Sequence, residues 1–275
     1  MNVNMLSQFI AMHSVDNHPS GNQDALSFLT DYLAIMGFVC TIKGQSKTDQ
    51  PTLIAHYPGR ESRNKIVLYG HYDVAPVNNT EQWKSQDPFQ LECIDKRYFA
   101  RGIADNKGPL MARLEAISEL IASGQPLPEI LWLIQGEEEV AMTDRVAKGI
   151  FHEEIERFGA KVFIEETGFN NLDTDRQIAF LWSPGLTRNE LVRWRPLIQQ
   201  TLQNVDIEYR HLNKFNGVDA CPLLGNLPED GVYIGFGPND KLHNIHRDNE
   251  SLCVQKLNLH RQQFKEFLRY YAGFS

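Results

Sequence analysis

The sequence predicts an α/β fold, in which a mostly parallel central sheet is flanked by helices on both faces within a single domain. Short apolar runs alternate along the chain with segments of helical periodicity, the pattern of a sheet built from strand–helix units. The runs at 66–69 and 130–134 are continuously apolar, which is typical of strands buried on both faces. No linker divides the 275 residues, so one large domain accommodates them.

Helices are predicted wherever apolar residues recur at steps of three and four. These segments are 6–10, 25–36, 106–123, 143–158, 187–203 and 249–272. Gly37 is expected to end the second helix, and the turn cluster 17–21 to precede it. Thr187 and Glu190 have the spacing of a capping box, which predicts that the fifth helix begins there.

Strands are predicted at the apolar runs that turn residues bound. These runs are 38–42, 51–57, 65–70, 129–135, 161–164, 176–182, 206–209 and 231–236, with a short hairpin at 89–99. Pro58 and Gly59 turn the chain between the second and third of these strands, and Gly70 and Gly136 end the third and fourth. The predicted order of elements therefore repeats the strand–helix alternation that favours a parallel sheet.

Composition excludes several classes of function. The net charge of −8 argues against nucleic acid and anionic membranes as partners. The four cysteines, without a C-x-x-C pair, form neither a disulfide framework nor a zinc-finger motif. No signal peptide is evident at the start of the sequence and no apolar run is long enough to span a membrane, so a cytoplasmic location is expected.

His71 and Asp73 directly follow the predicted strand 65–70. Open α/β sheets bind ligands beyond the carboxyl ends of their strands, so this position suits a functional site. One ring nitrogen of His71 could bind a metal, while Asp73 accepts the proton of the other nitrogen. A surface histidine paired with an aspartate is the alternative interpretation of this short motif.

Further acidic residues and a second histidine lie just after predicted strands or at a helix start. They are Asp105, Glu137, Glu138, Glu139, Glu165, Glu166 and His246. Asp105 could simply cap the helix that follows it, and the three consecutive glutamates could form a solvated acidic turn. A parallel sheet would nevertheless bring all of these positions to one edge.

Two histidines and several carboxylates suit two divalent ions such as zinc. Two metals about 3.5–4 Å apart polarise a carbonyl and generate hydroxide from a shared water. A hydrolytic site also needs one carboxylate that is not a ligand and acts as general base. The adjacent residues Glu138 and Glu139 can divide these two tasks.

The sequence resembles the zinc-dependent M20 metallopeptidases, a family that includes carnosinase-like dipeptidases, glutamate carboxypeptidase, acetylornithine deacetylase and succinyl-diaminopimelate desuccinylase. The resemblance rests on six blocks in the same order. They are GHYDV at 70–74, PF at 88–89, ARGIADNKG at 100–108, GEEEV at 136–140, EE at 165–166 and HxxNE at 246–250. PTLIAHYPG at 51–59 is most similar to the dipeptidase branch. The resemblance implies a zinc-exopeptidase-like fold and cleavage of a peptide or N-acyl amino acid amide bond.

The resemblance also implies a role for each site residue. His71 and Glu165 would bind the first zinc, Glu139 and His246 the second, and Asp105 would bridge both. Glu138 would act as general base on a metal-bridging hydroxide, and Asp73 would orient His71. Glu138 and Glu139 are aligned with the family's acidic pair in preference to Glu137, and Glu165 is preferred to Glu166 because it leaves the strand directly. A cis peptide bond is implied between Asp105 and Asn106.

The sequence departs from the family where a lid and dimerisation domain is expected. Only about 80 residues separate Glu165 from His246, and predicted strands and a helix of the main sheet fill them, so a further domain of about 100 residues does not fit. The lid would normally supply groups that steady the oxyanion and hold the substrate carboxylate. His243, Arg188, Arg193 and Arg195 are candidates for these roles, although surface solvation is the alternative for each. Without a lid, the chain is expected to be monomeric.

The resulting hypothesis is a di-zinc amidohydrolase acting on a small peptide or an N-acyl amino acid, with cobalt or manganese as alternatives to zinc. A second hypothesis is a lidless relative that binds metal or a partner without catalysis. The presence of Glu138 argues against it, because a pure binding module needs no general base. A third is a chain from which a lid has been removed, which the continuous strand and helix pattern of 176–203 disfavours. The substrate itself is not specified by the sequence.

Overall fold

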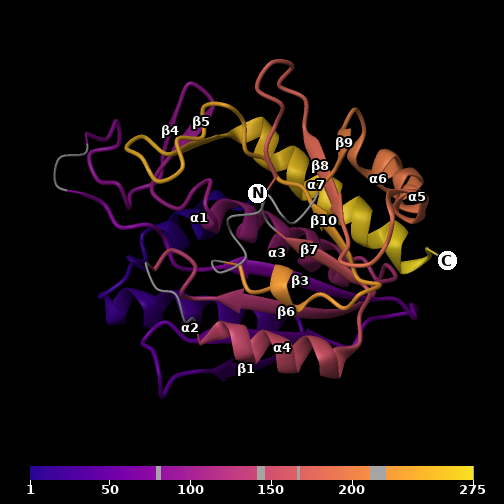
Figure 1. Cartoon of the computed structure of the whole chain (residues 1–275). Coiled ribbons are helices and arrows are strands. Elements are labelled where there is room, and N and C mark those ends of the chain that lie inside the picture. The colour runs from indigo at the N-terminus through magenta and orange to yellow at the C-terminus, as the bar shows by residue number, and fades with distance from the viewer. Residues whose placement is uncertain (79–81, 141–145, 166–167, 211–220, 275) are drawn as a thin grey trace.

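The computed structural model describes residues 1–78, 82–140, 146–165, 168–210 and 221–274. Its centre is an eight-stranded sheet with the strand order β1-β2-β6-β3-β7-β10-β8-β9 (Figure 1). The strands are β1 (Val39–Lys43), β2 (Thr52–Tyr57), β3 (Lys65–His71), β6 (Glu129–Gln135), β7 (Val162–Glu165), β8 (Ile178–Trp182), β9 (Asp206–Tyr209) and β10 (Val232–Gly235). Strands β6, β3, β7 and β10 are mutually parallel, and β8 and β9 are parallel to each other. The predicted mostly parallel α/β sheet is confirmed.

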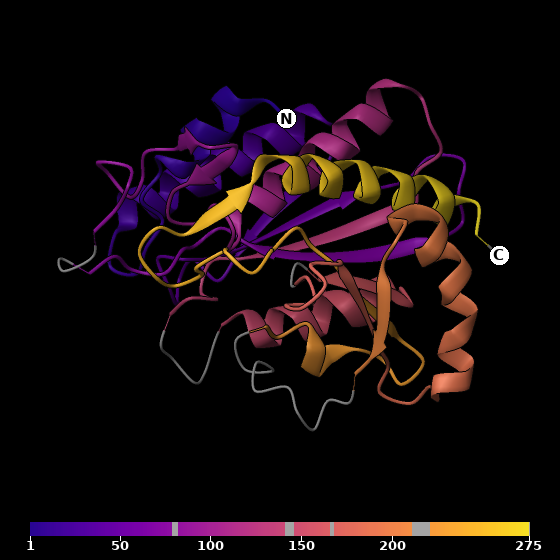
Figure 2. The same ribbon diagram turned by 90° about the horizontal axis from the view of Figure 1, so that it is seen from above.

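Helices cover both faces of this sheet. The helices are α1 (Val3–Ile10), α2 (Pro19–Ile35), α3 (Lys107–Ala122), α4 (Ala147–Phe158), α5 (Arg188–Leu191), α6 (Arg195–Leu202) and α7 (Val254–Ala272), with 3₁₀ turns η1 (Val192–Trp194) and η3 (Leu224–Asn226). One core cluster combines apolar residues of α1, α2, α3, α6 and α7, and a second contains those of α4 and η3. Figure 2 shows α7, in yellow, and α4 on opposite sides of the sheet.

The central strands are apolar between their end residues because both of their faces are buried. In β3, Ile66 and Leu68 belong to the first cluster, whereas Val67 and Tyr69 belong to the second. Strand β6 alternates in the same way, with Trp132 in the first cluster and Leu131 in the second. Successive side chains of a strand point to opposite faces, so burial on both sides requires an unbroken apolar run.

Some boundaries differ from the prediction for local reasons. Helix α2 begins at Pro19, inside the predicted turn cluster, because proline suits the first position of a helix and His18 caps it. The predicted capping box at Thr187 is present, but a 3₁₀ turn divides the helix that follows into α5 and α6. Residues 251–253 form strand β11 (Ser251–Cys253) rather than helix. Strand β11 pairs with β5 (Arg97–Phe99) of the predicted hairpin, whose other strand is β4 (Glu92–Ile94).

Arg113 of α3 joins the carboxyl ends of three central strands. Its guanidinium is buried and donates hydrogen bonds to the backbone oxygens of Tyr69 (3.4 Å), Glu165 (2.9 Å) and Phe236 (3.1 Å). Its Nε atom also donates to Nε2 of His260 at 3.3 Å. These contacts fix the relative positions of β3, β7 and the segment that follows β10.

We expect the substitution Arg113→Met to lower the free energy of unfolding by about 3 kcal/mol or more, because it leaves three buried backbone carbonyls without this donor. Urea denaturation followed by circular dichroism measures the change. Arg176→Met is the matched control, since the Arg176 side chain is 50% exposed, its partner Asp206 is also exposed, and the same loss of charge there should change stability little. Equal stability of the Arg113 variant and the unsubstituted protein would contradict the role assigned to Arg113.

Candidate metal centre

His71 is the last residue of β3, and its imidazole is completely buried. Its Nδ1 atom lies 3.0 Å from the backbone oxygen of Asp73 and 3.3 Å from the Asp73 carboxylate. Its Nε2 atom lies 3.0 Å from Oδ1 of Asp105. Asp73 therefore holds one side of the ring, and the other nitrogen faces the predicted site.

Asp105 lies between the two predicted histidine ligands. Its Oδ1 atom faces His71, and its Oδ2 atom lies 3.3 Å from Nε2 of His246. The alternative role of Asp105 as a helix cap is wrong, because the residue at the N-cap position of α3 is Asn106. The peptide bond between Asp105 and Asn106 is cis, which confirms the expectation from the family resemblance.

The three glutamates after β6 point to different partners. Glu139 accepts from His246, whose Nε2 atom lies 2.9–3.0 Å from its two carboxylate oxygens, and the backbone N–H of Glu139 donates to Asp73 at 2.8 Å. Glu137 instead accepts a hydrogen bond from the backbone N–H of Val146 at the start of α4. This difference agrees with the alignment of Glu138 and Glu139, rather than Glu137, with the acidic pair of the family.

Gly136 allows this acidic turn to leave the strand. A Cβ atom at Gly136 would lie 2.4 Å from the hydroxyl oxygen of Tyr72, which itself donates to the backbone oxygen of Pro51 at 2.8 Å. Because the Tyr72 hydroxyl is held in this bond, a larger residue at position 136 would displace the turn that carries Glu137–Glu139.

Two overlapping groups of side chains in the described ranges have the spacing of metal ligands. One contains His71, Glu138 and Glu139, and the other contains Asp105, Glu139 and His246. Neither group includes Glu165, whose buried carboxylate accepts a hydrogen bond from the Tyr233 hydroxyl at 2.7 Å. Glu166, the alternative to Glu165, lies outside the described residues.

Burial and mutual repulsion shift the pKa values of these groups. Burial raises the pKa of Glu138 to about 7, and repulsion from Asp105 and Glu139 adds to that effect while His71 opposes it. Hydrogen bonds to Asp105 and Glu139 raise the pKa of His246 to about 10. Burial alone would raise the pKa of Asp105, but its hydrogen bonds to His246 and His71 outweigh burial and lower it. In the absence of metal, protonated His246 therefore balances part of the negative charge of the carboxylates.

Glu250, the last residue of the HxxNE block, is central to this arrangement. Its carboxylate is fully buried and accepts hydrogen bonds from Arg101 (2.9 Å) and from the backbone N–H groups of Gly102 (3.1 Å), Ala104 (2.8 Å) and Asp105 (3.1 Å). Burial raises the pKa of Glu250 to about 7, against the opposing effect of Arg101. All four contacts are donors, the pattern that favours the ionised carboxylate. Glu250 thus joins the segment that carries Asp105 to the segment that carries His246.

His246 lies in a backbone conformation that few residues other than glycine adopt. Its φ is +63°, in the left-handed region, and its side chain is 54% exposed. Non-glycine residues in this region are uncommon and cluster at functional sites. The exposure of His246, beside the buried His71, indicates that the site opens to solvent on the His246 side.

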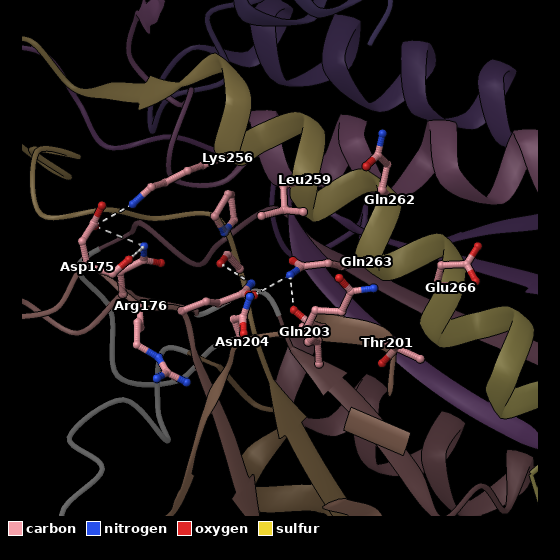
Figure 3. A pocket seen from close by; sticks show the side chains of 15 residues that line it. Asp175, Arg176, Thr201, Gln203, Asn204, Lys256, Leu259, Gln262, Gln263 and Glu266 are labelled. Carbon is pink, nitrogen blue, oxygen red and sulfur yellow. Dashed lines mark hydrogen bonds and ion pairs between the residues drawn. The ribbon is translucent and has the colours of Figure 1, made fainter. Parts of the chain in front are cut away.

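A cavity of about 460 Å³ lies next to α7 and the segment that follows β10 (Figure 3). A relay of amides crosses its wall, in which Gln263 donates to the backbone oxygen of Leu202 (2.7 Å) and to Gln177 (2.8 Å), and Gln177 donates to the backbone oxygen of Gly237 (3.0 Å). Both ends of the relay are carbonyl acceptors, so the amide orientations are determined. The relay holds the start of the loop that leads to His246.

The groups predicted to take the roles of a lid are dispersed. The Arg188 guanidinium lies over the ring of Tyr209, and that of Arg193 lies 5.4 Å from the ring centroid of Trp194. Trp194 contacts Tyr271, whose hydroxyl donates to the backbone of Lys65 at the amino end of β3, opposite the end that bears His71. Burial lowers the pKa of His243, and attraction from Asp240 and Asp105 opposes this effect. His243 therefore differs from these arginines in that it interacts electrostatically with Asp105 of the centre.

Residues 67–270 match the family model described as Peptidase family M20/M25/M40. The chain belongs to this peptidase family. The match includes His71, Asp105, Glu138, Glu139, Glu165 and His246. The M20 resemblance that the sequence motifs indicate is therefore confirmed.

Curated relatives from this family include named hydrolytic enzymes. The chain is 36% identical over 109 residues to human Beta-Ala-His dipeptidase, 30% over 136 residues to the cysteinylglycine-S-conjugate dipeptidase of Corynebacterium striatum, and 31% over 142 residues to the succinyl-diaminopimelate desuccinylase of Rickettsia akari. The aligned segments cover 38%, 50% and 50% of this chain. They span only 21%, 30% and 36% of the lengths of those relatives.

Solved structures of M20 enzymes share the fold. Human carnosine dipeptidase 1 aligns with a TM-score of 0.74 at 13% identity, covering 99% of this chain and 97% of that one. The dipeptidase Dug1p from Saccharomyces cerevisiae aligns with a TM-score of 0.75 at 12% identity, covering 99% of this chain and 96% of that one.

Among the described residues, no helix combines the length and the apolar character needed to cross a membrane.

We expect Glu250→Gln to lower the free energy of unfolding by about 3–5 kcal/mol, because it leaves the buried Arg101 guanidinium without its counter-charge. Urea denaturation at about pH 8.5, above the pKa of Glu250, measures the loss. Glu208→Gln on the exposed side of β9 is the control for the same chemical change and should leave stability within about 0.5 kcal/mol. A Glu250 variant as stable as the Glu208 variant would show that the carboxylate does not hold these loops together.

Proposed function

We propose that this protein is a di-zinc amidohydrolase that cleaves a peptide or N-acyl amino acid amide bond. The observation that carries the proposal is the position of Asp105, whose two carboxylate oxygens face the two imidazoles of His71 and His246. Glu139 reaches the same histidine as Asp105, and Glu138 lies within metal-ligand spacing of His71. Family membership and the names of the curated relatives support a hydrolytic role.

The donor set fits zinc. Imidazole nitrogens and carboxylate oxygens are ligands that zinc accepts, with cobalt and manganese as alternatives. The Nδ1 atom of His71 is held by Asp73, which is the outer contact expected of a metal-binding histidine. In the proposed assignment, His71 and Glu165 hold one ion, Glu139 and His246 hold the other, and Asp105 contributes to both. Since Tyr233 donates to one oxygen of Glu165, the assignment requires the other oxygen to face the ion.

Glu138 is the proposed general base. When bound, the two ions would polarise the carbonyl of the scissile bond and lower the pKa of water in the site. The Glu138 carboxylate takes a proton from the attacking water and returns it to the leaving nitrogen. Burial raises the pKa of Glu138 to about 7, which places its proton affinity near that of an efficient base at neutral pH.

The proposed enzyme has one catalytic domain and no separate lid between 166 and 245. The described residues of this region supply β8, α5, α6, β9 and β10, and these strands are part of the central sheet. A site without a lid would be open to solvent, and His246 is 54% exposed. We therefore propose that small peptides or N-acyl amino acids enter from the His246 side.

We expect the protein to bind two zinc ions, and His246→Ala to retain at most one, because Glu139 and Asp105 alone are a weaker set of ligands. Metal analysis by mass spectrometry after dialysis measures the number of zinc ions bound per protein chain. Removal of zinc with a chelator should lower the unfolding midpoint, since a ligand at one hundred times its Kd contributes about 2.7 kcal/mol. His152→Ala, whose side chain is 67% exposed on α4, is the control and should bind both ions. Fewer than two ions in the unsubstituted protein would refute the di-zinc centre.

We expect Glu138→Gln to retain both zinc ions while kcat falls by about 10²–10⁴, because glutamine cannot accept the proton. Glu165→Gln should instead lose one ion. The assays combine metal analysis with hydrolysis of dipeptides, aminoacyl amides and N-acyl amino acids. If Glu138→Gln loses an ion and Glu165→Gln keeps both, the two roles are exchanged. Zinc binding without hydrolysis of any substrate would favour the non-catalytic alternative.

A further inference from the structure

Tyr233 of β10 contacts a predicted metal ligand through its hydroxyl group. The hydroxyl donates to Oε2 of Glu165 at 2.7 Å, and both side chains are buried. A phenol carries its proton at neutral pH, so the tyrosine is the donor and the carboxylate is the acceptor. Hydrogen bonds to an ionised carboxylate are among the stronger ones in proteins, so this contact limits how the carboxylate can turn.

The register of the sheet places this pair of side chains beside His71. Strand β10 pairs with β7 so that Tyr233 is opposite Phe163, two residues before Glu165. Tyr233, Phe163 and Tyr69 all belong to the second core cluster, on the face that α4 covers. Because side chains alternate along a strand, Glu165 points to the same face as Phe163. For the same reason, His71 points to the same face as Tyr69. Strands β7 and β3 are neighbours, so Glu165 and His71 lie next to each other on one face.

The backbone of Glu165 is held as well as its side chain. Arg113 donates to the backbone oxygen of Glu165 at 2.9 Å from α3, whose buried residues belong to the first core cluster, on the opposite face from α4. Tyr233 holds the carboxylate on the face of α4. Glu165 is therefore positioned from both faces of the sheet before any metal binds. A ligand that is already in place loses less freedom on binding, so it binds an ion more tightly.

We propose that Tyr233 positions Glu165 so that the carboxylate binds the first ion through a single oxygen. This inference rests on the proposed di-zinc function, in which His71 and Glu165 hold that ion. The Tyr233 hydroxyl contacts Oε2, so Oε1 is the oxygen that would bind the ion. A carboxylate that gives one oxygen suits the tetrahedral preference of zinc, whereas manganese prefers an octahedral set of oxygens. Tyr233 thereby favours zinc over manganese at this position.

The substitution Tyr233→Phe removes the hydroxyl and keeps the ring. We expect one of the two zinc dissociation constants to rise at least about tenfold and the other to stay within about threefold, because an outer contact of a metal ligand typically contributes about ten- to hundredfold in affinity. The affinity for manganese should fall less than that for zinc, because the released carboxylate can offer both oxygens. Competition with a fluorescent chelator, on the full chain, measures the affinities for both metals.

Tyr271→Phe is the matched control for a purely structural role. Tyr271 is 5% exposed, and its hydroxyl donates to the backbone oxygen of Lys65 at 2.9 Å, at the end of β3 opposite His71. Both variants lose one hydroxyl that donates a hydrogen bond, so both should lower the urea midpoint of the metal-free protein. Only Tyr233→Phe should change the affinity for zinc.

A double variant tests whether Tyr233 acts through Glu165. Glu165→Gln alone is expected to lose the first ion. Adding Tyr233→Phe to it should leave the affinity for the remaining zinc ion within about threefold, because the group that Tyr233 positions is no longer a ligand.

The outcomes separate this role from the proposed function. If Tyr233→Phe binds two zinc ions with unchanged affinities, the role of Tyr233 is overturned and the di-zinc centre stands. An equal fall in the affinities for zinc and manganese would overturn binding through a single oxygen. Equal weakening of zinc by Tyr271→Phe, or a further loss in the double variant, would show a general structural effect instead. Fewer than two zinc ions in the unsubstituted protein would refute the proposed centre, and this inference with it.

Discussion

The structure depends on one buried cation that fixes where the parallel strands end. Arg113 reaches from α3 to backbone oxygens at Tyr69, Glu165 and Phe236, so it holds the ends of β3, β7 and β10 in register. Each of these ends leads to a residue of the candidate centre, namely His71, Glu165 itself and His246. The charge of Arg113 lies against these carbonyl dipoles and the ring faces of Phe236 and Phe264. It also contacts His260, whose pKa is lowered far below its usual range by burial. The geometry of the site therefore follows from packing beneath it.

The loops above this base are held by a second buried ionic contact. Glu250 receives Arg101 and three backbone N–H groups, one of which belongs to Asp105. Asp73 has a comparable role on the other side, where it contacts His71 and the backbone of Glu139. Carboxylates that do not face the centre thus position those that do, which is the role that outer contacts have in metal sites.

Much of the fold could be predicted from the sequence, because a strand that is buried on both faces appears as a continuous apolar run. The runs that contain Ile66 and Trp132 have no polar interruption, and both became central strands. The start of α2 and the strand β11 could not be predicted, because Pro19 and residues 251–253 depend on a cap and on a pairing partner distant in the sequence. The break between α5 and α6 likewise could not be predicted, because the spacing of apolar residues does not indicate it.

The site was predictable where residue type and strand position coincide. Histidines and acids directly after strands identified His71, Asp105, Glu139 and His246 as neighbours, and the structure brings them together. Arg113 and Glu250 could not be identified in this way, because each acts on backbone atoms whose positions only the tertiary structure reveals. The tasks of Glu138 and Glu165 also depend on which oxygen faces which neighbour, and sequence spacing carries no such information.

Glu250 and His246 lie four residues apart on one segment, and this has a consequence for how the centre would exchange its ions. A movement of that segment that withdraws His246 also removes the Glu250 carboxylate from the backbone of Asp105. In the proposed centre, Asp105 contributes to both ions, so loosening one position loosens the other. Loss of metal would then be cooperative, and the half-loaded protein would be a minor species during depletion.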